Sequence, residues 1–165
     1  MDIQNNLSLL AGVINLGLGF VVWARGHKNT LNALYSLVAL SVASWCFSVI
    51  PFRSAVDPAE SLLWSKILYI SPISIVTSFF FFNFTFLYQE RASRVSHLLP
   101  LVPASATLVL TLWPDMVIKE VIHSAGEKKI VFGPVYPIYF IFIIAYFCWS
   151  FVILSKQYFN SSGIS

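Results

Sequence analysis

Long runs of apolar residues alternate with short polar segments along the chain. The five runs cover residues 7–24, 31–52, 67–88, 95–113 and 135–154. A bilayer core about 30 Å thick requires roughly 20 apolar residues in a helix, so runs of this length predict membrane-spanning helices. With their flanks, the predicted helices cover residues 7–24, 31–52, 62–88, 95–113 and 135–156 of one domain, residues 1–165. The pattern predicts an all-α integral membrane fold, a five-helix transmembrane bundle.

Two of the five runs depart from an ideal span. Pro100 and Pro103 lie inside the fourth run, and each removes a backbone donor from a helix. The first run is short, and residues 1–6 before it contain no Lys or Arg. Because a secretory signal peptide begins with a basic segment, we interpret the first run as a retained helix.

The distribution of charge supports a lipid environment. None of the five runs contains Asp, Glu, Lys or Arg. A single charged residue of this kind would cost about 2.5 to 3.5 kcal/mol at the centre of a spanning helix. Only 10% of all residues are charged, whereas a soluble domain has about 25%. The net charge of +3 then comes from residues that flank the spans, and it predicts no nucleic-acid partner.

Basic residues in the connections predict the orientation of the helices. With the N-terminus outside, the inner and outer segments contain five basic residues each. The inner ones are Arg25, Lys28, Arg91, Arg94 and Lys156, and the outer ones are Arg53, Lys66, Lys119, Lys128 and Lys129. The first helix usually decides orientation, and Arg25 and Lys28 follow it directly. We therefore expect a multi-pass protein of the inner (plasma) membrane, with its N-terminus outside and its C-terminus in the cytoplasm.

Two connections have patterns of their own. Asp57 and Pro58 resemble a helix start with proline at the first position, leading directly into the third span. The outer loop 114–134 has β-branched residues on both sides of Gly126, which predicts a small β-hairpin. An amphipathic surface segment is the alternative for this loop.

Polar residues inside the runs are candidates for contacts between helices. Ser44 lies one turn before Ser48, a spacing of small residues that permits close helix packing. Asn15 and Asn83 each have an amide with two donors and one acceptor to satisfy. For Asn15, Ser44 and Asn83, interhelical polar contact is a better interpretation than ligand binding.

A proline in the third run predicts a candidate ligand cavity. Pro72 should kink the helix and open a gap that other groups fill. We expect an outward-facing apolar cavity lined by Trp45, Ser48, Tyr69 and Pro72. The cysteines and histidines are scattered, so the sequence predicts no catalytic residue, no cofactor and no metal site.

A set of aromatic, basic, Pro and Gly residues is distributed along the chain. The most informative are Trp45, Trp64, Lys66, Tyr69, Pro103, Gly133, Tyr139 and Tyr146. Together with residues 23–32 and the segments LLWSKILYISPISI, LLPLVPASATLVLTLWP and GPVYPIYFIFIIAY, they resemble the N-terminal seven-transmembrane sensor region of bacterial and archaeal histidine kinases. This resemblance extends over nearly the whole chain. It implies a prokaryotic input domain that joins a cytoplasmic kinase or diguanylate cyclase module and works as a homodimer.

The chain departs from this family in having five predicted helices instead of seven. The sequence has no phospho-acceptor histidine region, ATP-binding glycine-rich segment or cyclase signature. We therefore expect an incomplete sensor module that is not itself an enzyme, with catalysis on a missing or separate segment.

The leading hypothesis for function is a membrane-embedded sensory input domain of a signal-transduction protein. Such a domain, held in the lipid bilayer, would detect a small apolar or extracytoplasmic ligand and pass a helix shift inward. The alternative is a small membrane transporter or channel subunit, although such proteins usually show internal repeats or intramembrane charges. A membrane enzyme is the third hypothesis. It is the weakest, because the predicted spans contain no set of residues arranged for catalysis.

Overall fold

The computed structural model describes residues 3–88, 99–124 and 127–161. Its elements in chain order are α1 (Ile3–Gly26), α2 (Thr30–Ser54), α3 (Pro58–Tyr88), α5 (Leu101–Leu112), β1 (Ile118–Ser124), β2 (Glu127–Phe132) and α6 (Tyr136–Ser161). Among these residues, the four helices α1, α2, α3 and α6 are long and apolar enough to cross a membrane. The protein is thus mostly helical, with one small antiparallel sheet.

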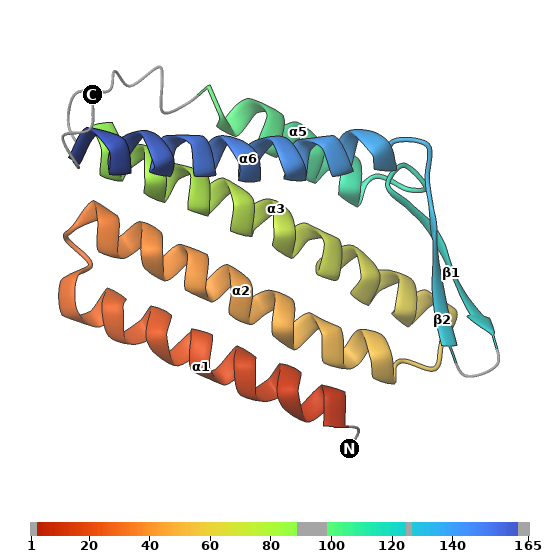
Figure 1. Cartoon of the computed structure of the whole chain (residues 1–165). Helices are drawn as coiled ribbons and strands as arrows, with labels where there is room; N and C mark the ends of the chain where they lie inside the picture. The colour runs from red at the N-terminus through yellow and green to blue at the C-terminus, as the bar shows by residue number, and fades with distance from the viewer. Residues whose placement is uncertain (1–2, 89–98, 125–126, 162–165) are drawn as a thin grey trace.

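The four long helices lie side by side, and the β-hairpin stands across one end of them (Figure 1). α1 packs on α2, α2 on α3, and α3 on α6, while α5 lies against α3 and α6. The first and last described helices leave the two chain termini at opposite ends of the bundle. The hairpin lies at the end nearer the N-terminus.

The fourth predicted helix is present only in part among the described residues. α5 has 12 residues, too few for a bilayer of about 30 Å. Pro100 is its N-cap residue and Pro103 lies in its first turn, where a missing N–H leaves no hydrogen bond broken. The prolines therefore mark the start of α5. Residues 95–98 of the predicted helix lie outside the described residues, as do Glu90, Arg91 and Arg94 of the preceding connection.

The third helix begins at Pro58, as the Asp57–Pro58 pattern indicates. The side-chain carboxylate of Asp57 accepts a 3.0 Å hydrogen bond from the backbone N–H of Glu60. This contact satisfies one of the donors that a helix leaves open in its first turn. Residues 58–61 are thereby added to the helix ahead of its predicted start at 62.

The predicted β-hairpin in the loop 114–134 is confirmed. β1 and β2 pair antiparallel from Ile118↔Phe132 to Ser124↔Glu127, with an irregularity between Ile118 and Glu120. Gly133 closes the hairpin, since its N–H donates to the carbonyl of Val117 at 3.0 Å. A Cβ atom at Gly133 would lie 2.1 Å from the carbonyl oxygen of Asp115. Only glycine fits this close approach of two backbone segments.

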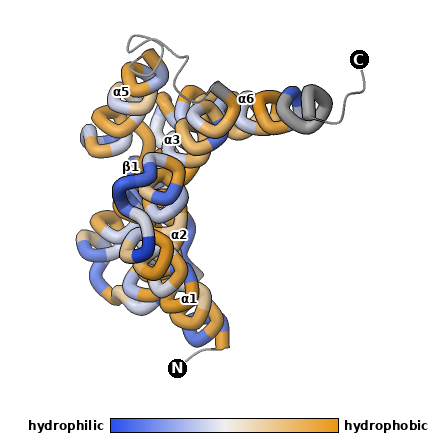
Figure 2. The backbone as a smooth tube through the Cα atoms, turned by 90° about the vertical axis from the view of Figure 1, so that its left-hand side faces the viewer, coloured by the Kyte–Doolittle hydropathy of each residue, from blue (hydrophilic) through white to orange (hydrophobic). Residues whose placement is uncertain are grey.

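The buried core lies where α3, α5, α6 and the hairpin meet. Its members are Ile73, Val76, Ala104, Val117, Ile118, Tyr139 and Phe142. By contrast, the buried residues of α1 are two glycines, Gly12 and Gly19, which face α2. Apolar residues run along the helices, whereas a hydrophilic stretch is found at β1 (Figure 2). The outward-facing apolar side chains of the long helices suit contact with lipid.

Candidate functional site

Pro72 lies inside α3 with helical backbone on both sides. Proline has no N–H, so the carbonyl of Leu68, four residues before Pro72, loses its regular helical donor, and the ring disturbs the hydrogen bonding around it. The hydroxyl of Tyr139 in α6 donates a 2.9 Å hydrogen bond to the backbone carbonyl of Tyr69, three residues before Pro72. A polar group from α6 therefore lies next to the proline of α3.

Four aromatic side chains surround this hydrogen bond, and we call them the Tyr69 cluster: Tyr69, Phe132, Tyr136 and Tyr139. The ring of Tyr69 lies 5.9 Å from that of Phe132 and 5.5 Å from that of Tyr139, measured between centroids. Phe132 and Tyr136 stack at 3.8 Å. Aromatic pairs at such distances attract each other beyond their area burial. The cluster joins α3, β2 and α6 at the hairpin end.

Two lysines contact the C-terminal carbonyls of helices at this end. Lys128 of β2 donates to the carbonyls of Phe52 and Arg53 at the end of α2, and its ammonium lies 5.4 Å from the centroid of the Phe52 ring. Lys66 of α3 donates to the carbonyl of Leu112 in α5 at 3.3 Å. Such carbonyls lack helical donors and carry the negative end of the helix dipole, so cations stabilise them.

The hairpin also contacts the start of α3. Nε2 of His123 in β1 lies 3.0 Å from the hydroxyl oxygen of Ser61, a hydrogen-bonding distance, and Ser61 is fully buried. Partial burial lowers the pKa of Lys128, and the nearby carboxylate of Glu60 opposes this change. Together, His123 and Lys128 attach the two strands to two different helices.

The residues predicted to line one ligand cavity have different surroundings. The hydroxyl of Ser48 donates to the carbonyl of Trp45 at 2.8 Å, and Ser48 lines a hollow between α1, α2 and α3 together with Ser44 and Trp64. The side chain of Trp45 is 42% exposed. Tyr69 belongs to the cluster beside α6. A single cavity lined by Trp45, Ser48, Tyr69 and Pro72 stays a prediction.

The polar residues predicted to join helices also stay predictions. The amide of Asn15 donates to the carbonyl of Ala11 in its own helix at 2.9 Å. Ser44 is exposed. The side-chain nitrogen of Asn83 is buried and has no hydrogen-bond partner among the residues that the structure describes. Most buried serine and threonine hydroxyls bond back to their own helix, for example Thr111 to the carbonyl of Thr107.

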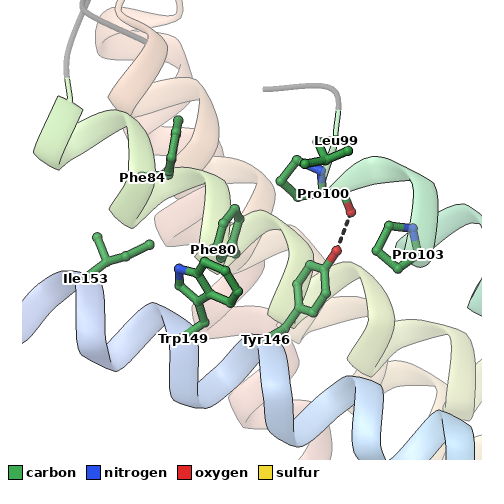
Figure 3. A pocket seen from close by; sticks show the side chains of 8 residues that line it. All are labelled: Phe80, Phe84, Leu99, Pro100, Pro103, Tyr146, Trp149 and Ile153. Atoms are coloured by element: carbon green, nitrogen blue, oxygen red, sulfur yellow. Dashed lines mark hydrogen bonds between the residues drawn. The ribbon is translucent and has the colours of Figure 1, made fainter. Parts of the chain in front are cut away.

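A second cavity lies near the opposite end, between α3, α6 and the start of α5 (Figure 3). Its volume is about 370 Å³. It is lined by Phe80, Phe84, Leu99, Pro100, Pro103, Tyr146, Trp149 and Ile153. The hydroxyl of Tyr146 donates to the backbone carbonyl of Pro100, so α6 is hydrogen-bonded to the residue that precedes α5.

Sequence reasoning did not select this second cavity. A signal was present, because Phe80 and Phe84 are one turn apart, and so are Tyr146, Trp149 and Ile153 in succession. Side chains at such spacings share one face of a helix. The partner of Tyr146, Pro100 at the start of α5, gave no such signal, because Tyr146 binds its backbone carbonyl, a group that every residue has.

The Tyr69 cluster and the second cavity both offer groups for noncovalent binding. The groups are aromatic rings, hydroxyls and backbone carbonyls, and the described residues contain no group of three or more His, Cys, Asp or Glu placed to hold a metal ion. Both places also join helices through tyrosine hydroxyls. Such contacts can hold helices in one arrangement and be exchanged for another.

A family model described as the N-terminal 7TM region of histidine kinase matches residues 7–165. No curated protein matches the chain, and no solved structure does.

Proposed function

The chain belongs to the family of N-terminal 7TM regions of histidine kinases, and from this membership we propose that it detects a cue in or outside the membrane and passes a helix shift to a kinase module. A region of this family is a sensory input domain and is not itself catalytic. The family implies association with a membrane and with a cytoplasmic kinase module. The nature of the cue and the direction of the shift are our proposal.

The observation that carries this proposal is the attachment of the hairpin to three helices. Lys128 attaches it to α2, His123 attaches it to α3, and Phe132 stacks on Tyr136 at the start of α6. A ligand that displaces the hairpin must therefore change the surroundings of all three helix ends. This is the arrangement expected of an element that converts binding into helix movement.

The element that we propose to have two arrangements is α3 at Pro72. A proline inside a helix weakens the backbone hydrogen bonds around it, and here Tyr139 of α6 supplies one of the remaining contacts. If α6 shifts, this contact is lost and the kink can change. A ligand drives such a shift only when it binds the two arrangements with different affinities.

We further propose the orientation and the partners. The N-terminus and the hairpin face the outside of the inner membrane, and α6 continues towards the cytoplasmic kinase module. The termini lie at opposite ends of the bundle (Figure 1), which supports termini on opposite sides of the membrane, and the basic residues Arg25 and Lys28 after the first span favour this direction. A homodimer is our proposal for the working state, and a diguanylate cyclase module is the alternative output.

The test measures autophosphorylation of the kinase module that works with this region, in membrane vesicles. Tyr69→Ala removes the ring that contacts Phe132 of the hairpin, and Trp45→Ala removes a ring of the predicted cavity. Leu37→Ala, at a half-exposed position of α2, is the control. We expect Tyr69→Ala and Trp45→Ala to change basal activity or the response to stimulus, with unchanged insertion. Phosphorylation equal to that of Leu37→Ala in both variants would overturn the proposal.

A further inference from the structure

The cavity in Figure 3 has the size and the lining of a small-molecule site. Its volume of about 370 Å³ falls within the range of roughly 300 to 1,000 Å³ typical of ligand pockets. The ring of Phe80 lies 5.5 Å from that of Tyr146 and 6.3 Å from that of Trp149. Three aromatic rings from two helices therefore meet at one wall of the cavity.

Among the described residues, no side chain in the lining carries a charge. The eight described lining residues are apolar or aromatic, so a charged ligand would lose its hydration there without gaining an ion partner from them. Phe80 and Trp149 lie inside two of the helices that are long and apolar enough to span a membrane. A molecule dissolved among lipid chains could therefore enter the cavity without crossing water.

A polar pair lies at the α5 side of the cavity. The Tyr146 hydroxyl donates to the Pro100 carbonyl, and a carbonyl oxygen has two acceptor sites. Within the part of the chain that the structure describes, the neighbouring carbonyl of Leu99 accepts one long 3.3 Å bond, from the N–H of Val102, because the regular helical donor would be Pro103, which has no N–H. A ligand with one hydroxyl or carbonyl group would find both a donor and acceptors here.

We propose that this cavity binds a neutral, single-chain amphiphile taken up from the membrane, with an apolar chain and one terminal hydroxyl or carbonyl group. The chain lies against Phe80, Phe84 and Trp149, where burial of apolar surface stabilises it. The terminal group takes over a hydrogen bond of Tyr146 or Pro100.

Binding of this kind would act on the contact between α5 and α6. A ligand that replaces the Tyr146 hydroxyl at Pro100 binds the separated arrangement better than the joined one, which is the condition for a ligand to shift a conformational equilibrium. This step rests on the proposed sensory function, whereas occupation of the cavity does not.

The experiment uses a dodecanol that carries a photoreactive diazirine in its chain. The purified full chain is reconstituted in phospholipid nanodiscs and irradiated, and the labelled peptides are identified by mass spectrometry. We expect labelling to concentrate on the peptides that contain Phe80, Leu99 and Trp149. Unlabelled dodecanol should compete about tenfold better than dodecane or dodecyltrimethylammonium, a difference that corresponds to one or two hydrogen bonds.

Two variants separate the cavity from general lipid contact. Leu99→Trp fills the cavity from an exposed position, and Leu112→Trp adds the same ring at an exposed position at the other end of α5. We expect labelling to fall in the first and to stay unchanged in the second. Tyr146→Phe should keep labelling but reduce the preference for dodecanol over dodecane about fivefold.

Equal labelling in Leu99→Trp and Leu112→Trp, or labelling spread evenly over the lipid-facing helices, would overturn the inference. Different results would overturn the proposed sensory function and the proposed binding site. Specific labelling without any effect of dodecanol on kinase phosphorylation would support the site and count against its sensory use. A kinase that responds to another cue, with no specific labelling, would overturn the site and leave the sensory function standing.

Discussion

Tyr139 and Tyr146 are seven residues apart on α6, and each donates its hydroxyl hydrogen to a backbone carbonyl of another part of the chain. Tyr139 binds the carbonyl of Tyr69 in α3, and Tyr146 binds that of Pro100 before α5. Seven residues are close to two helical turns, so both side chains leave α6 from nearly the same face. In each case the accepting backbone lies close to a proline. α6 is thereby hydrogen-bonded to α3 and to the N-cap residue of α5, and it packs against both of these helices.

The contact between Tyr139 and Tyr69 should contribute to stability. Tyr139→Phe keeps the ring in the Tyr69 cluster and removes the hydroxyl, so we expect a loss of about 0.5 to 1.5 kcal/mol in the free energy of unfolding. Tyr136→Phe is the matched control, because the hydroxyl of Tyr136 has no hydrogen-bond partner within the part of the chain that is described. Unfolding of the purified chain in mixed micelles, followed by circular dichroism, gives both values. Equal losses in the two variants would contradict the role assigned to the hydroxyl.

The close approach at Gly133 predicts a severe effect of a single methyl group. In Gly133→Ala, the Cβ would lie 2.1 Å from the carbonyl oxygen of Asp115 and 2.3 Å from that of Met116. Because both atoms belong to backbone, the base of the hairpin must move. We expect faster proteolysis within residues 114–134. Gly17→Ala is the control, since nothing lies within 4 Å of a Cβ there, and a helix gains about 1 kcal/mol from this exchange. Resistance equal to that of the native chain would show that the hairpin tolerates the shift.

The sequence predicted the helices and the hairpin because both follow from local patterns. An apolar run without charges has few stable forms other than a helix in lipid, and β-branched residues around Gly126 favoured paired strands. The length of α5 was harder to predict. Pro100 and Pro103 were recognised as obstacles inside a span, but in the structure they occupy the N-cap and the first turn of a shorter helix.

The contacts between elements could not be predicted to the same degree. Tyr139 and Lys128 bind backbone carbonyls, and a backbone acceptor leaves no trace in the sequence. Trp45, Ser48 and Tyr69 were assigned to one cavity because the kink at Pro72 should open a gap. A kink does not fix the direction in which each side chain leaves its helix, and Tyr69 lies on the side of α3 that faces α6, so the single cavity stays a prediction.

Lys128 should stabilise the last turn of α2. Lys128→Gln removes the ammonium from the carbonyls of Phe52 and Arg53, at the negative end of the helix dipole, where a cation contributes about 0.3 to 1 kcal/mol. We expect faster amide hydrogen exchange in residues 50–54. Lys129→Gln is the control, because the side chain of Lys129 is exposed on the same strand. Exchange that rises equally in both variants would indicate a general effect of charge instead of this contact.

The hydrogen bond between His123 and Ser61 should appear as non-additivity in a double-mutant cycle. Ser61 is fully buried, so His123→Ala leaves a buried hydroxyl without its partner, and Ser61→Ala leaves the imidazole without its own. Each single change should therefore destabilise the docked hairpin. The double variant removes both groups and should cost less than the sum of the two, with a coupling energy of about 0.5 to 1.5 kcal/mol. Hydrogen exchange of the β1 amides measures all three variants. Additive costs would mean that the 3.0 Å approach of Nε2 to the serine hydroxyl contributes nothing to holding the hairpin on α3, and the hairpin's attachment to α3 would then rest on the buried core around Ile118 and on the ring contact between Tyr69 and Phe132.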